Sequence, residues 1–84
     1  MGRNIKDVIE EIKSVSANED LHAELTRISN NATFKAPELM YELWDEMHLL
    51  LLNVYINPFT SDEALEVFAI FTTKTKEELL AMKS

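Results

Sequence analysis

The sequence contains no cysteine, its one glycine is Gly2, and its two prolines are Pro37 and Pro58. Without cysteine the chain can form neither a disulfide framework nor a thiolate metal site, so a reducing cytoplasm is the expected compartment. Without glycine beyond position 2, a glycine-rich phosphate-binding loop is excluded. Backbone positions with positive φ are then expected to be occupied by asparagine. The scarcity of glycine and proline favours helices joined by short links.

Basic residues are missing from the middle of the chain. Between Ala36 and Thr73 there are seven acidic residues and no lysine or arginine, whereas the rest of the chain has eight acids and eight bases. The whole net charge of -7 therefore lies in this segment. Such a segment repels nucleic-acid phosphates and anionic lipids and attracts basic proteins, so we expect no direct nucleic-acid binding.

The spacing of the apolar residues predicts an all-α fold, a compact bundle of four to five helices with a long central helix near 37–55. Asn4 is expected to cap a first helix, whose apolar residues are Ile5, Val8, Ile9, Ile12 and Val15. A second helix is expected to begin at a cap on Ser16 or Asn18 and to stop near Asn30 and Asn31. Pro37 suits the first turn of the third helix, which should end near Tyr55 because Asn57 precedes Pro58.

Two further capping boxes predict the last two helices. Thr60 with Glu63, and Thr75 with Glu78, have the required spacing of three residues. The intervening segment 64–73 is rich in strand-favouring residues, but a lone strand cannot satisfy its backbone hydrogen bonds, so helix is preferred. We expect one helical domain over 4–84, with residues 1–3 disordered or left over from expression.

The central helix changes character halfway along. Glu38, Glu42, Asp45 and Glu46 fall within an arc of about 100° on a helical projection, and Leu49 and Leu52 continue that stripe. The leucine run 49–52 is too short to span a membrane, which takes roughly 20 apolar residues. Two alternatives remain: other helices of the chain cover these leucines, or the leucines face a second copy or another protein.

The sequence offers little for catalysis. His22 and His48 each follow a carboxylate by three residues, Glu19 and Asp45, but such pairs arise easily by chance in a chain with 15 acids. The cluster of Glu42, Asp45 and Glu46 is better interpreted as a solvated helix face than as an acid-base pair, because acid-base catalysis needs a buried carboxyl group and these side chains are expected to be exposed. We therefore expect no enzyme activity, no catalytic residue, no metal and no cofactor.

In size, acidity and helical content, the chain from Asn4 to Ser84 resembles the small cytoplasmic modulators that bacteriophages encode: anti-sigma factors, inhibitors of host defence and lysis-inhibition accessory proteins. The resemblance concerns only these general features, and it assigns a functional role to no residue. It implies a module that binds and regulates or inhibits a protein with a basic or amphipathic surface, with a homodimer or larger oligomer also expected. The alternatives are a DNA mimic and a self-assembling structural subunit. The expected contact residues are Glu38, Tyr41, Glu42, Asp45, Glu46, Leu49 and Leu52.

Overall fold

A computed structural model describes residues 4–83, and it confirms the all-α prediction. The elements follow in the order α1 (Ile5–Val15), α2 (Glu19–Phe34), the 3-10 helix η1 (Pro37–Leu39), α3 (Met40–Tyr55), α4 (Asp62–Thr72) and α5 (Lys76–Lys83). The long central helix is η1 together with α3, and segment 64–73 is helical. The expectation for residues 1–3 lies outside the described part of the chain.

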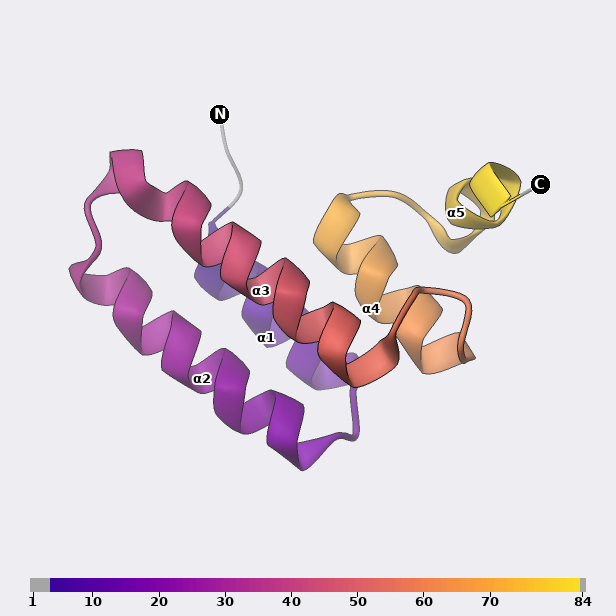
Figure 1. Cartoon of the computed structure of the whole chain (residues 1–84), viewed down its shortest axis with the longest axis horizontal. Helices are drawn as coiled ribbons and strands as arrows, with labels where there is room; N and C mark the ends of the chain where they lie inside the picture. Colours follow the sequence, from indigo (N-terminus) through magenta and orange to yellow (C-terminus); the bar gives the residue numbers. More distant parts are fainter. Residues whose placement is uncertain (1–3, 84) are drawn as a thin grey trace.

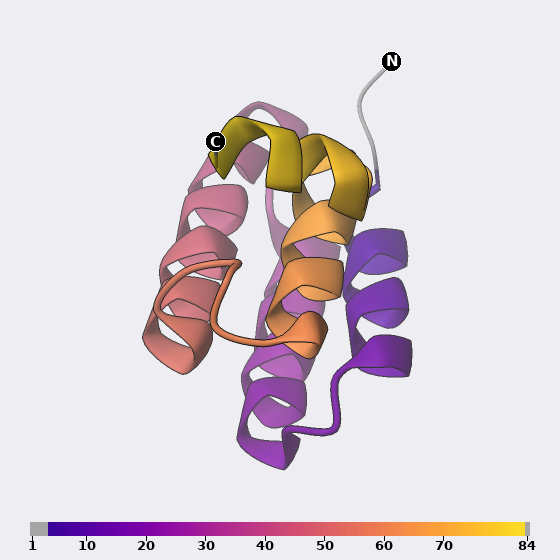
Figure 2. The same ribbon diagram turned by 90° about the vertical axis from the view of Figure 1, so that its right-hand side faces the viewer.

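The helix α1 packs against both α2 and α4 (Figure 1). The helix α3 runs antiparallel to α2 and also contacts α4, so one side of α3 is covered along its length. The short helix α5 packs on α4 and lies across its end (Figures 1 and 2). The opposite side of α3 faces away from the other helices of the bundle.

One hydrophobic core holds the bundle together. The predicted stripe of α1 is buried at Ile5, Val8, Ile9 and Ile12, and α2 contributes Leu21, Leu25, Ile28 and Ala32. Leu43, Met47, Leu51 and Tyr55 come from α3; Ala64, Leu65, Val67, Phe68 and Ala69 from α4; and Leu79 from α5. Burial of this apolar surface is the main stabilising contribution, at about 25 cal/mol per Å² removed from water.

Several predicted helix starts are confirmed. The Asn4 side chain accepts a hydrogen bond from Lys6 N, and Asn18, rather than Ser16, caps α2. Thr75 and Glu78 form the reciprocal capping box before α5. The box predicted at Thr60 is wrong, because Ser61 caps α4 through Ala64 N.

Two further expectations are also wrong. The helix α2 does not stop at Asn30 and Asn31 but continues to Phe34, because Ala32 extends the buried stripe by one more turn. Among the described residues, those with positive φ are Ile56 and Thr73 rather than asparagines. Thr73 has the left-handed conformation that commonly ends a helix, and there the helix end decides the backbone conformation in spite of the β-branched side chain.

Candidate interaction surface

The leucine run is divided between the core and the surface. Leu51 is fully buried, whereas Leu50 and Leu52 are partly buried against the core. Leu49 is 62% exposed. Each step of 100° along a helix turns the next side chain to another direction, so four consecutive leucines cannot share one environment. The chain therefore covers Leu50, Leu51 and much of Leu52 and leaves Leu49 exposed, so the first alternative holds for all but Leu49, and contact of Leu49 with a second copy or another protein stays a prediction.

The acidic stripe is divided in a similar way. Lys35 Nζ lies 2.9 Å from Glu42 Oε1, and the Arg27 guanidinium lies 2.6 Å from Glu46 Oε1. The hydrogen bond to Glu46, followed by the one to Glu24, raises the pKa of Arg27. Bases from α2 and from the residue that follows it therefore neutralise the side of the stripe that adjoins α2.

The carboxylates on the other side of the stripe, Glu38 and Asp45, are not paired with bases of the described chain 4–83. Both side chains are exposed. Asp45 lies four residues after Tyr41 and four before Leu49, so these three side chains follow one another on the same face of α3. Tyr41 is 60% exposed. This arrangement brings an unpaired carboxylate between two exposed apolar side chains.

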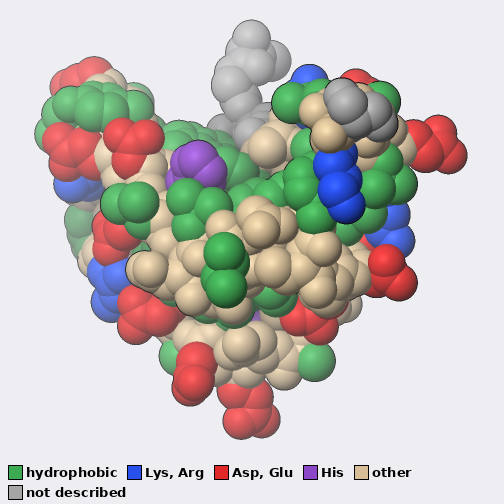
Figure 3. All heavy atoms as spheres, turned by 45° about the vertical axis from the view of Figure 1, so that its right-hand side comes forward, with side chains coloured by type: hydrophobic (Ala, Val, Ile, Leu, Met, Phe, Trp, Pro, Cys, Tyr) green, Lys and Arg blue, Asp and Glu red, His purple; other side chains and the backbone are tan. Residues whose placement is uncertain are grey.

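We call the outer face of α3 the α3 surface and define it by Glu38, Tyr41, Asp45, Leu49 and the exposed edge of Leu52. These are five of the seven predicted contact residues. The other two, Glu42 and Glu46, border it as members of ion pairs. In Figure 3, hydrophobic side chains appear as patches among backbone and other atoms over the upper middle of the face that brings α3 and α5 into view, and carboxylates lie mainly around its borders.

Aromatic contacts fix α3 against α4. The ring centroid of Phe71 lies 5.9 Å from that of Trp44 and 5.3 Å from that of His48, whose ring is stacked on it. Offset and stacked aromatic pairs contribute about 0.5–1.5 kcal/mol each beyond their buried area. Trp44 and His48 thus hold the middle of α3 in position, a role that the one-dimensional pattern does not indicate because Phe71 belongs to another helix.

A polar cluster holds the C-terminal end of α3. The Tyr55 hydroxyl donates a hydrogen bond of 2.5 Å to Glu63 Oε2 and lies 2.8 Å from Ser16 Oγ. Glu63 Oε1 accepts from the Ala17 backbone N–H at 3.2 Å. Burial and the bond to Glu63 raise the pKa of Tyr55 to about 12. The hydrogen bonds from Tyr55 and Ala17 lower the pKa of Glu63.

This cluster contains residue types that occur in hydrolases, but its geometry is structural. Ser16 is buried, and so its hydroxyl is closed to a substrate. His22 Nε2 lies 2.6 Å from the carbonyl oxygen of Ser16, so the imidazole engages the backbone rather than the hydroxyl that it would have to activate. The cluster instead joins the turn after α1, the end of α3 and the start of α4.

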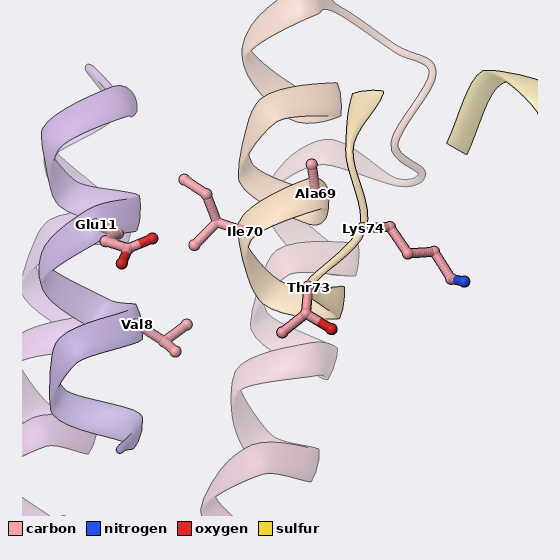
Figure 4. Close-up of a pocket in the computed structure, with 6 residues that line it drawn as sticks. All are labelled: Val8, Glu11, Ala69, Ile70, Thr73 and Lys74. Atoms are coloured by element: carbon pink, nitrogen blue, oxygen red, sulfur yellow. The ribbon is translucent and has the colours of Figure 1, made fainter. Parts of the chain in front are cut away.

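A shallow groove of about 350 Å³ lies between α1 and α4. Its apolar floor comes from Val8, Ala69 and Ile70, and its polar members are Glu11, Thr73 and Lys74. In Figure 4, Ile70 points towards α1, whereas the Lys74 side chain extends away from it, so Glu11 and Lys74 do not converge on a common point. The groove lacks the convergent polar groups that fix a ligand in a specific site.

The described residues form neither a metal-binding cluster nor a membrane-spanning helix. Within 4–83, no group of three or more histidine, aspartate or glutamate side chains comes together in a metal-binding arrangement. No helix formed by these residues combines the length and the hydropathy that crossing a bilayer requires. Comparison with protein-family models, with curated proteins and with solved structures found no significant match to the chain. The α3 surface is therefore the best-supported candidate site, on geometry alone.

Proposed function

We propose that this protein is a non-catalytic cytoplasmic interaction module that binds another protein through the α3 surface and thereby regulates or inhibits it. One observation carries the proposal: Tyr41 and Leu49 are 60% and 62% exposed, and the carboxylate between them, Asp45, has no ion-pair partner within residues 4–83. Exposed apolar residues beside unneutralised charge are typical of a contact surface.

The chemistry of the surface favours a basic amphipathic helix as partner. A single exposed helix face is convex and packs well against the ridges of a second helix. Apolar side chains of that helix would cover Tyr41 and Leu49, and its lysines or arginines would reach Asp45 and Glu38. Charge attraction would accelerate encounter and apolar burial would supply affinity. A modulator of the type that bacteriophages encode would act in this way, by covering a basic helix of its target.

The two alternative functions have less support. A DNA mimic needs a line of unneutralised carboxylates, but Arg27 and Lys35 already pair with Glu46 and Glu42. Self-assembly through the same surface would offer Glu38 and Asp45 no base, because the α3 surface carries no lysine or arginine in either copy. Self-assembly leads to a measurable outcome in the experiment below.

The test uses a synthetic peptide of about 18 residues, a length that matches α3 as a helix. Its leucines occupy one helical face and its lysines the other, and a control peptide carries glutamate in place of lysine. Isothermal titration calorimetry with the full chain should show binding of the lysine peptide only. Raising the salt concentration from about 0.05 M to about 0.5 M should weaken binding, mainly through a slower association rate.

Matched variants separate the α3 surface from general acidity. Leu49→Lys should weaken binding of the lysine peptide by about tenfold or more. Ala23→Lys adds the same charge to an exposed position on α2 and should change affinity much less. Equal losses in both variants would show that net charge alone attracts the peptide and would contradict the proposal. A dimer of the chain in sedimentation equilibrium that excludes the peptide would favour self-assembly.

A further inference from the structure

The backbone at Ile56 is strained. Its φ of 72° and ψ of -57° place it at the centre of a γ-turn, in which Asn57 N–H donates to Tyr55 O at 2.8 Å. This positive-φ form of the γ-turn is rare, and a β-branched side chain there clashes with the neighbouring backbone. Glycine would take the same conformation without that clash.

The fold itself makes little use of the Ile56 side chain. It is 72% exposed and belongs neither to the core nor to the partly buried residues that pack against the core. Thr73, the other positive-φ residue among 4–83, is a C-cap as Ile56 is, but Thr73 has the left-handed conformation that commonly ends a helix, whereas Ile56 does not. The strain at Ile56 therefore lacks an equivalent explanation in the packing of the chain.

The residues on both sides hold Ile56 in this position. Before it, Tyr55 is fixed by Glu63 and Ser16. After it, Asn57 Oδ1 accepts from Phe59 N–H at 2.8 Å, and the Thr60 hydroxyl donates to Asn57 O at 3.1 Å. A strained residue persists when its surroundings over-determine its conformation, and such residues are enriched at binding sites.

Ile56 also adjoins the C-terminal end of the α3 surface. It is the C-cap of α3 and follows Leu52 by four residues, so its exposed side chain comes directly after the last helical turn, although its positive φ turns that side chain away from the direction a helical residue would have. From Met47 to Ser61 the chain has no lysine, arginine, aspartate or glutamate. The surface is thus acidic at the Glu38 end and uncharged and apolar at the Ile56 end.

We propose that Ile56 is the apolar anchor of the α3 surface and that the partner helix has a matching asymmetry, with its bases opposite Glu38 and Asp45 and an uncharged apolar end against Ile56. This inference rests on the proposed function and specifies its partner further. Charge complementarity fixes the orientation, because a base opposite Ile56 would lose hydration without gaining a carboxylate.

The test compares Ile56→Gly, Ile56→Ala and Thr73→Gly with the wild type. The probe is a leucine-lysine peptide of about 18 residues whose lysines are confined to one half, with glutamine at the polar positions of the other half. Ile56→Gly should raise Tm by about 4 °C or more because it relieves the strain, and should weaken peptide binding by about tenfold. Ile56→Ala keeps a Cβ in the strained turn, so it should weaken binding similarly without the rise in Tm.

Thr73→Gly is the matched control at the other residue with positive φ and should leave affinity unchanged. Wild-type affinity in Ile56→Gly would overturn the anchor assignment while leaving the proposed function intact, provided that Leu49→Lys still weakens binding. A fall in Tm for Ile56→Gly would overturn the assignment of strain. No binding of the peptide by the wild type would contradict the proposed function, and this inference with it.

Discussion

The hydroxyl of Tyr55, the last residue of α3, donates a 2.5 Å hydrogen bond to the carboxylate of Glu63 in the first turn of α4. The bond spans the α3–α4 connection and fixes the end of the helix that carries the α3 surface. Replacing tyrosine with phenylalanine should therefore cost about 1 kcal/mol in the free energy of unfolding, measured by urea denaturation. Tyr41→Phe, at an exposed position, is the control and should stay within about 0.5 kcal/mol of wild type.

The same pair predicts the loss of stability in acid. The pKa of Glu63 is lower in the folded chain than its ordinary value, so the folded state binds fewer protons at this site than the unfolded state. This contribution is complete above the ordinary pKa and disappears as the pH falls through the lowered one. Denaturation profiles of wild type and Glu63→Gln should therefore converge below about pH 4. A constant difference between them down to pH 2 would contradict this assignment.

Alkaline unfolding tests the other partner. Because the pKa of Tyr55 is raised to about 12, the unfolded chain releases the phenolic proton before the folded chain does. The neutral phenol stabilises the fold fully below about pH 10, and this contribution is lost as the pH rises from about 10 towards about 12. Ultraviolet titration should show one tyrosine ionising late in wild type, and Tyr55→Phe should remove that late transition while Tyr41→Phe retains it.

The division of the leucine run predicts unequal effects from identical substitutions. Leu51→Ala empties a fully buried site and should cost about 2–5 kcal/mol in unfolding free energy. Leu49→Ala removes a side chain that is mostly in solvent and should change stability by no more than about 0.5 kcal/mol. Comparable losses in the two variants would show that Leu49 is covered in the folded chain, by its own helices or by a second copy.

The division of the acidic stripe makes a similar prediction for binding. Asp45→Asn and Glu46→Gln remove the same charge, but Glu46 already pairs with Arg27. Asp45→Asn should therefore weaken binding of the leucine-lysine peptide more than Glu46→Gln does, in calorimetry at low salt. Neither variant should alter stability by more than about 1 kcal/mol, because exposed ion pairs contribute little.

Local patterns predicted the fold well and the surface only in part. Asn4, and Thr75 with Glu78, were identifiable as caps because capping involves neighbouring residues. The pairing of Glu42 and Glu46 with bases from outside α3 depends on how α2 and α3 pack, and a helical projection contains no such information. Ile56 was missed because the helical pattern ends at Tyr55 and no sequence signal indicates an isoleucine in a γ-turn.

Binding at the outer face of α3 is tested most directly by a nuclear magnetic resonance titration of the isotope-labelled chain with the leucine-lysine peptide. The amide signals of Tyr41, Asp45, Leu49 and Ile56 should shift most, with smaller changes along the buried side of α3. Shifts confined to the groove between α1 and α4, around Val8 and Ala69, or no shifts at millimolar peptide, would contradict the assignment of the α3 surface as the contact site.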